Sequence, residues 1–283
     1  MINKCLFPAG GYGTRFLPIT KSVPKEMLPI LNKPLLQYGI EEAMNAGISN
    51  MAIVTGKNKR AIEDHFDRSN ELESLIKGKP QEKNLNEIKK IIDHATFTYV
   101  RQKDVLGLGH AILSSRPLIG NQTFAVHLAD DLCITNNKSL LAQLIKIHVK
   151  YNCSVVAIEE VPINESNKYG IISGSLISGS KNCYKVEDMI EKPEPHESPS
   201  NLAIIGRYIL TPDIFDILKK TSPDFNNEIQ ITDALKIQAR KGKVVAYKFN
   251  GRRFDCGNIQ GYLNATNYFA KINGLEINTY ESY

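Results

Sequence analysis

Residues 8–29 read PAGGYGTRFLPITKSVPKEMLP and follow a short apolar run at 5–7 that is typical of the first strand of an α/β sheet. Glycines at positions 10, 11 and 13 let a backbone turn approach a ligand closely, because a Cβ atom there would collide with it. The N–H groups of such a turn converge on an anion and form a phosphate-binding nest. Three cations follow within eleven residues, more than a structural turn needs: Arg15, Lys21 and Lys25. Together these features predict a site for a nucleoside triphosphate.

Two commoner phosphate-binding loops do not fit this spacing. A Walker loop that began at Gly10 would need glycine at position 15 and lysine at 16, where the chain has Arg15 and Phe16. A dinucleotide fingerprint that began at Gly11 would fit Gly13 but would need glycine or alanine at 16, and it also meets Phe16. The alternative of a glycine-rich turn that only joins a strand to a helix explains the glycines and leaves the cations without a role.

The following residues predict an α/β fold in which strands and helices alternate. Short apolar runs predict strands at 51–54, 97–100, 124–128 and 154–158. Helices are expected near 35–46, 58–68, 109–116 and 138–150, and residues 69–93 are expected to form two polar helical pieces separated at 77–80. Such alternation predicts a Rossmann-like, mixed and mostly parallel sheet with helices on both faces.

After about residue 160 the pattern changes to a smaller, β-rich half. Hairpin strands are expected at 169–174, 184–190 and 203–210, helices near 212–220 and 232–241, a strand at 244–249 and a C-terminal helix near 258–271. No linker rich in Pro, Gly or Ser separates two independent domains. We therefore predict a single domain over 1–283, with a first half at about 1–160, a second half at about 161–257, and a C-terminal helix and tail at about 258–283.

Composition argues against several classes of function. The net charge of +5 over 283 residues is mild, no block of five or six like charges occurs and Trp is absent, so nucleic acid is not an expected partner. Five cysteines, an odd number without C-x-x-C spacing, argue against a disulfide scaffold and a zinc cluster. Neither a signal peptide nor an apolar run of about eighteen residues occurs, so we expect no membrane partner and a cytoplasmic location.

Residues 8–29 resemble the signature of the nucleotidyltransferases that make nucleoside-diphosphate sugars, and the PKEMLP ending is similar to bacterial UTP–glucose-1-phosphate uridylyltransferases. Eight further blocks resemble that family in the same order: VRQK at 100–103, GLGHA at 107–111, LADD at 128–131, KYG at 168–170, EKP at 191–193, SNLAIIGRY at 200–208, NEIQITD at 227–233 and DCG at 255–257. The resemblance implies transfer of a uridylyl group from UTP to glucose 1-phosphate, which gives UDP-glucose and pyrophosphate. It makes the first half nucleotide-binding and the second half sugar-binding, and we expect a homodimer or homotetramer.

Two adjacent carboxylates, Asp130 and Asp131, come directly after the apolar strand at 124–129. Ligands of open α/β sheets bind outside the carboxyl ends of the strands, so a metal site is expected there. Successive strand residues point to opposite faces, and we therefore expect Asp130 as a ligand of Mg²⁺ and Asp131 as a supporting or sugar-side group. A paired Asp that only caps a turn is the alternative that the residues alone leave open. The resemblance implies a second metal contact from Asp255, although an Asp before Gly is by itself more typical of a turn.

The sugar-binding residues are implied by the resemblance. Lys192 matches a lysine that binds the sugar phosphate, and Glu191 matches a glutamate that accepts hydrogen bonds from sugar hydroxyls. An isolated E-K-P sequence would indicate only a charged pair at a strand end, with the proline limiting the directions of the lysine. The remaining residues of the expected sugar wall are Tyr169, Gly170, Asn201, Gly206 and Asp131.

The family pattern also implies the nucleotide contacts, which are Ala9, Gly10, Gly11, Gly13, Thr14, Glu26, Gln102 and Gly107. Within this set the backbone of Ala9 and Gly10 and the side chains of Glu26 and Gln102 are expected at the uracil. A surface ion pair with the adjacent Lys25 is the alternative role for Glu26. We expect His110 to be a residue near a helix N-terminus and not an acid or base.

The implied reaction needs no protein base. A sugar 1-phosphate is largely dianionic at pH 7, because its second pKa is about 6, and its oxygen attacks the α-phosphorus of UTP in line as pyrophosphate leaves. Mg²⁺ and three catalytic cations, Arg15, Lys25 and Lys192, would offset the repulsion between the two polyanions. Two alternatives stay open: a thymidylyltransferase or other sugar-1-phosphate nucleotidyltransferase, and a non-catalytic regulatory protein that binds nucleotide sugars.

Overall fold

A nine-stranded mixed sheet forms the centre of the computed structural model, which describes residues 2–136 and 138–275. Its strand order within those residues is β5-β4-β1-β6-β11-β8-β12-β10-β9. The first four strands pair in parallel: β5 (Thr96–Arg101), β4 (Asn50–Thr55), β1 (Lys4–Pro8) and β6 (Phe124–His127). The predicted mixed α/β sheet is confirmed, and parallel pairing dominates its first half.

The second half of the sheet is built mainly from antiparallel pairs. β11 (Leu202–Leu210) runs antiparallel to both β6 and β8 (Ser154–Glu160). β12 (Val244–Lys248) is parallel to β8, and it is followed by the antiparallel pair β10 (Cys183–Glu191) and β9 (Gly170–Leu176). Because β8 lies between β11 and β12, the two halves expected from the sequence share one sheet.

Helices cover both faces of the sheet, because alternate strand residues point to opposite sides. In β1, Leu6 belongs to one core, whereas Cys5 and Phe7 belong to the other. The core of Leu6 is closed by α5 (Gly107–Ser114), α6 (Arg116–Ile119), α8 (Ile214–Leu218) and α9 (Ile231–Arg240). The core of Phe7 is closed by α1 (Leu35–Asn45), α2 (Arg60–Phe66), α4 (Glu82–His94) and α7 (Leu140–Tyr151).

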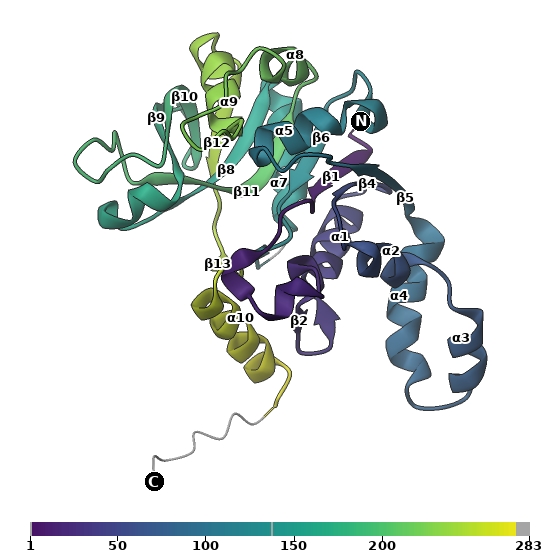
Figure 1. The fold of residues 1–283 in the computed structure, drawn as a ribbon. Helices are drawn as coiled ribbons and strands as arrows, with labels where there is room; N and C mark the ends of the chain where they lie inside the picture. The colour runs from purple at the N-terminus through teal and green to yellow at the C-terminus, as the bar shows by residue number, and fades with distance from the viewer. Residues whose placement is uncertain (1, 137, 276–283) are drawn as a thin grey trace.

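The predicted surface excursion at 69–93 consists of α3 (Asn70–Ile76) and α4, as expected from the break at 77–80. Figure 1 shows α3 and α4 on the opposite side of the molecule from β9 and β10. Short 3₁₀ helices lie at Thr14–Phe16, Ile19–Lys21, Lys25–Met27 and Ile163–Lys168. No helix among the described residues is both long enough and apolar enough to cross a membrane.

A second, two-stranded sheet was not predicted. It pairs β7 (Asp131–Ile134) with β13 (Arg252–Asp255) in antiparallel register, with Asp131 opposite Asp255. Both strands have four residues, so their apolar patterns are too short to be recognised. A further short pair joins β2 (Pro29–Ile30) and β3 (Lys33–Pro34).

The C-terminal helix α10 (Ile259–Ile272) supports the second sheet from below in Figure 1. Its Ala265 shares an apolar cluster with Leu132 of β7, Phe254 of β13 and Phe16 of the glycine-rich segment. This cluster connects three parts of the chain that are far apart in sequence. The tail that was expected after this helix falls on residues 276–283, outside the described residues.

Candidate active site

The glycine-rich loop begins at the carboxyl end of β1, beside the ends of two other parallel strands. The N–H of Ala9 donates to the carbonyl of Val54 at 2.8 Å, which continues the pairing of β1 with β4. A Cβ atom at Gly10 would lie 2.5 Å from Oε1 of Gln102, and one at Gly56 would lie 2.8 Å from the carbonyl oxygen of Gly10. The start of the loop therefore packs tightly between the chain segments that follow β4 and β5.

The middle of the loop is open on one side. A Cβ atom at Gly11 would meet no atom within 4 Å, whereas one at Gly13 would lie 3.0 Å from Cβ of Lys25. Gly13 has a φ of 66°, in the left-handed region that favours glycine, and its carbonyl accepts a hydrogen bond from the hydroxyl of Thr20 at 2.8 Å. The exposed Thr14 and Arg15 follow in the first 3₁₀ helix. The loop is therefore open at Gly11 and packed against Lys25 at Gly13.

The residues expected at the base are buried. Glu26 is 1% exposed and pairs with Nζ of the buried Lys59 at 2.7 Å, which excludes the alternative of a surface ion pair with Lys25. Nε2 of Gln102 lies 3.4 Å from the carbonyl oxygen of Gly107 and 3.0 Å from Nδ1 of His110, a residue near the start of α5. Burial raises the pKa of Glu26, and its Oε1 has no hydrogen-bond partner among the described residues. A buried, unpaired acceptor is available for a ligand donor.

Lys59 is a residue of this group that the sequence analysis missed. It has no marker in the local sequence, because the lysine that follows a strand and precedes a helix is usually solvated.

The two carboxylates expected to bind metal converge on Gly257. A Cβ atom at Gly257 would lie 3.0 Å from Oδ1 of Asp255 and 3.1 Å from Oδ2 of Asp130, so these two oxygens are no more than about 6 Å apart. Asp255 is held by the N–H of Gly257 and the amide of Asn258, each at 3.0 Å. Nζ of Lys25 lies 2.5 Å from Oδ2 of Asp130.

The charges around the carboxylates of Asp130 and Asp255 suit a divalent cation. Burial alone would raise the pKa of Asp130, but the ammonium of Lys25 and further hydrogen bonds hold it below its ordinary value. The Asp130 carboxylate in turn raises the pKa of Lys25. No group of three or more His, Cys, Asp or Glu side chains within residues 2–136 and 138–275 could hold a metal alone. Two carboxylates around a cradle that a single Cβ would fill match Mg²⁺, which takes its other ligands from phosphates and water.

Asp131 lies opposite Asp255 at the start of β7 and joins a buried network with Arg253. Its Oδ2 accepts the N–H of Gly206 at 2.6 Å, and its Oδ1 pairs with Nε of Arg253. The same guanidinium pairs with Glu159 and lies 5.2 Å from the ring centroid of Tyr169. Arg253 was missed from the sequence, although it is two residues before Asp255 and therefore shares a strand face with it.

A polar cavity of about 220 Å³ lies next to these carboxylates. Eight predicted residues line it: Arg15, Asp130, Asp131, Tyr169, Gly170, Glu191, Gly206 and Asp255. Further lining comes from residues that the sequence did not single out: Leu108, Leu128, Lys168, Ile204, Ile205, Tyr208, Gln230, Ile231, Thr232 and Arg253. The cavity therefore joins the nucleotide loop, through Arg15, to the strands of the second half.

Glu191 is oriented at the wall of this cavity by Thr232, whose hydroxyl donates to Oε2 at 2.6 Å. A Cβ atom at Gly170 would lie 2.9 Å from Oγ1 of Thr232 and 3.2 Å from Oε2 of Glu191, so glycine allows this close approach. Lys192 is half-exposed, with its Nζ 3.5 Å from Oε1 of Glu191. Asn201 is exposed and lies outside the cavity lining, and its backbone carbonyl accepts the N–H of Val161.

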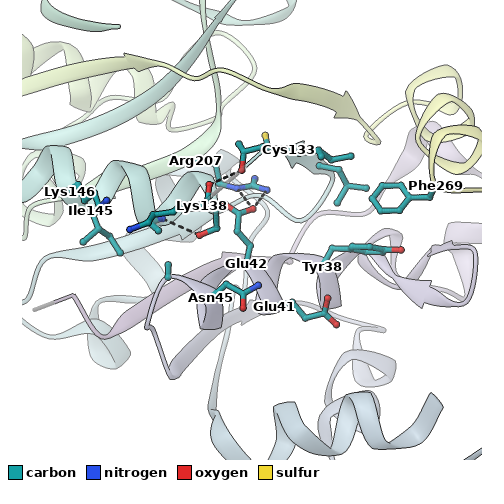
Figure 2. A pocket seen from close by; sticks show the side chains of 16 residues that line it. Tyr38, Glu41, Glu42, Asn45, Cys133, Lys138, Ile145, Lys146, Arg207 and Phe269 are labelled. Carbon is teal, nitrogen blue, oxygen red and sulfur yellow. Dashed lines mark hydrogen bonds and ion pairs between the residues drawn. The ribbon is translucent and has the colours of Figure 1, made fainter. Parts of the chain in front are cut away.

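A larger cavity of about 710 Å³ lies elsewhere, between α1, α7, β7 and α10, and it holds none of the predicted site residues (Figure 2). Tyr38 and Phe269 lie close together at one end, with ring centroids 5.1 Å apart. At its base, the buried Arg207 donates to Oε2 of Glu42 at 2.9 Å, and His127 contacts the same oxygen at 3.2 Å. Volume alone would select this cavity, but the nucleotide loop and the paired carboxylates lie at the smaller one.

A glycine-rich turn at the carboxyl end of a parallel strand, two convergent carboxylates and a polar cavity beside them are the features expected of a nucleotide-binding α/β enzyme. The chain belongs to the nucleotidyl transferase family, whose pattern it matches over residues 6–272. Members of this family typically use a divalent metal. The family predicted from the sequence blocks is thereby confirmed.

Several relatives resemble the chain over nearly its whole length. It is 59% identical over 269 residues to a UTP–glucose-1-phosphate uridylyltransferase of Pseudomonas aeruginosa. This match covers 95% of this chain and 96% of the relative. A crystal structure of a UDP-glucose pyrophosphorylase complexed with UDP-glucose is 56% identical, with a TM-score of 0.90, and the match covers 96% of this chain and 100% of that chain. A UTP-bound enzyme of the same kind from Acinetobacter baumannii is 35% identical, with a TM-score of 0.85 and coverage of 95% and 94%.

Proposed function

We propose that this protein transfers the uridylyl group of UTP to glucose 1-phosphate and releases pyrophosphate, giving UDP-glucose. The observation that carries the chemistry is the convergence of Asp130 and Asp255 on Gly257, between the glycine-rich loop and the polar cavity. The choice of uracil and glucose is supported by relatives that are named for this reaction and by related structures described as holding UDP-glucose or UTP. They favour an enzyme over a non-catalytic binder, and uridylyl over thymidylyl transfer.

The glycine-rich loop binds and orients the triphosphate in this proposal. The space beside Gly11 is open, so the backbone N–H groups of the loop would donate to phosphate oxygens there, with positive charge supplied by Arg15 and Lys25. Each contact between unit charges is worth about 4 kcal/mol at 4 Å and an effective dielectric constant of about 20, before desolvation. Gly13 and Thr14 complete the loop.

The base is recognised by groups that the fold has already buried. We propose that the backbone of Ala9 and Gly10, the amide of Gln102 and the free Oε1 of Glu26 meet the hydrogen-bonding edge of uracil. Gly107, whose φ of 86° lies in the region that favours glycine, would pack beside the base.

The sugar phosphate binds on the other side of the carboxylates. We propose that Lys192 contacts the phosphate, while Glu191, Tyr169 and Gly170 face the hexose from the cavity wall. Asp131 and Gly206 hold this wall in place through their hydrogen bond. Asn201 would join the wall only if its side chain turned inward from its exposed position.

Mg²⁺ would be held by Asp130 and Asp255, and when bound it would supply positive charge that neutralises the phosphates. The phosphate nucleophile is already ionised at pH 7, so the side chains need only hold both substrates in line. Such positioning contributes on the order of 7–11 kcal/mol to lowering a barrier. His110 has no place in this mechanism, because it packs against Gln102.

The test is pyrophosphate release across a grid of four nucleoside triphosphates and several sugar 1-phosphates. We expect UTP with glucose 1-phosphate to react fastest, and a chelator to stop the reaction. Equal rates with TTP, or no release with any pair, would contradict the proposal. The homodimeric or homotetrameric state and the cytoplasmic location expected from the sequence stay predictions, which analytical ultracentrifugation and cell fractionation test.

A further inference from the structure

Lys25 and Asp130 are 105 residues apart in the chain and form a direct ion pair at the centre of the site. Nζ lies 2.5 Å from Oδ2, and the two side chains are 26% and 22% exposed. Oδ2 is also the Asp130 oxygen that lies close to Gly257, beside Oδ1 of Asp255. The ammonium therefore binds the oxygen that faces the second carboxylate.

The two carboxylates differ in how they are neutralised. Asp255 accepts its hydrogen bonds from the uncharged groups of Gly257 and Asn258, and it forms no ion pair among the described residues. Carboxylates brought this close repel each other unless a cation lies between or beside them. Lys25 is the cation in contact with Asp130.

Lys25 is also placed to leave Asp130. Its Cβ lies 3.0 Å from the position of a Cβ at Gly13, so the base of the side chain borders the phosphate-binding loop. A lysine has a flexible four-carbon stem and a compact charged end, which can reach either of two anions from one backbone position.

We propose that Lys25 is an internal counter-ion for the metal site: it occupies Asp130 in the metal-free enzyme, and a divalent cation binds there by exchanging with it. This inference rests on the proposed function for the identity of Asp130 as a metal ligand. The displaced ammonium is then free for the triphosphate, which gives it a new anionic partner. Metal and triphosphate consequently favour each other's binding, and this coupling is reciprocal.

If a metal ion exchanges with Lys25 at Asp130, removal of the ammonium should change the affinity for the triphosphate and the affinity for the metal in opposite directions. Removing the ammonium weakens the hold on the triphosphate and lowers turnover, but it frees Asp130 and strengthens metal binding by the free protein. A lysine that only contacted substrate phosphates would leave the metal affinity of the free protein unchanged.

The experiment titrates Mn²⁺ alone into the full-length protein without nucleotide and measures free Mn²⁺ by electron paramagnetic resonance. We expect Lys25→Met to lower the Kd for Mn²⁺ by about tenfold or more, a modest part of what a contact between unit charges is worth. Lys25→Arg, which keeps the charge, should give no gain. Lys21→Ala is the matched control, because it removes an exposed cation from the same segment and should also give no gain.

The increase in Mn²⁺ affinity expected for Lys25→Met must depend on Asp130. The double variant Lys25→Met/Asp130→Asn should bind Mn²⁺ no more tightly than Asp130→Asn alone. An unchanged or higher Kd in Lys25→Met would overturn the proposal, and so would an equal gain in the Asp130→Asn background.

Folding of each variant is checked by its melting temperature, and Lys25→Gln replaces Lys25→Met if the latter does not fold. If the wild-type protein released no pyrophosphate from any substrate pair, the proposed function would fail, while the Mn²⁺ titration would still test exchange at Asp130.

Discussion

The variant Gly11→Ala should have opposite effects on the stability of the free protein and on its affinity for UTP. In the free protein a Cβ atom at this position would meet nothing within 4 Å, and the residue has no positive φ. Alanine should therefore fit without strain, and by restricting the unfolded chain it should stabilise the protein by about 0.4–1 kcal/mol. For a chain of this size that corresponds to a rise in melting temperature of about 1–4 °C.

With UTP the same methyl group stands where a phosphate should approach. Hydrogen bonds to charged groups are worth about 1.5–3 kcal/mol each, so the loss of one such bond should raise the Kd for UTP by about 10- to 150-fold. The assays are differential scanning fluorimetry without ligand and isothermal titration calorimetry with UTP.

Gly10→Ala is the comparison variant. Its Cβ atom would lie 2.5 Å from Oε1 of Gln102, so it should lower the melting temperature of the free protein as well as the affinity for UTP. The argument for the loop would be refuted if Gly11→Ala destabilised the free protein by several degrees, or if it bound UTP as tightly as the wild type.

Three further predictions concern the sugar phosphate, the acidic pair and pH. Lys192→Ala should raise KM for glucose 1-phosphate and lower kcat while the Kd for UTP in calorimetry stays constant; an equal loss of UTP binding would contradict this division. Asp130→Asn should abolish metal-dependent turnover with little change in melting temperature. Asp131→Asn breaks the buried ion pair with Arg253 and should lower the free energy of unfolding by about 3 kcal/mol. A normally active Asp130→Asn variant would contradict the assignment of Asp130 as a metal ligand. Burial lowers the pKa of His127 from 6.5, so the unfolded chain binds its proton first and the free energy of unfolding should fall as pH drops below about 6.5. A second fall should follow below about 4.5, because Arg207 outweighs burial and lowers the pKa of Glu42; urea unfolding from about pH 2 to pH 8 measures both, and His127→Gln should flatten the first.

Much of the fold follows from local patterns because its strands are buried and its helices are amphipathic. The run at 51–54 became β4, and the helical spacing that begins after Pro34 became α1. The sequence also predicted different roles for Asp130 and Asp131, and the structure gives them different partners, but Asp130 lies in the turn between β6 and β7 and not on a strand.

The second sheet and the buried network could not be predicted in the same way. β7 and β13 are four residues long, and the partner of each is more than a hundred residues away. Arg253 and Lys59 matter because of what the fold brings beside them, namely Asp131 and Glu26. Charged residues are usually solvated, so only the tertiary structure shows that these two are buried in ion pairs.

The small sheet explains why the nucleotide loop and both carboxylates form one site. Phe16, Leu132 and Phe254 pack in one apolar cluster, and each is close in sequence to a different part of the site. Phe16 follows Arg15 directly, Leu132 is two residues after Asp130, and Phe254 precedes Asp255. Because these side chains are buried together, the loop cannot move from the carboxylates without opening that cluster. The distance between Asp130 and Asp255 is therefore set by hydrophobic packing beneath the site, while Lys25 balances their charge above it.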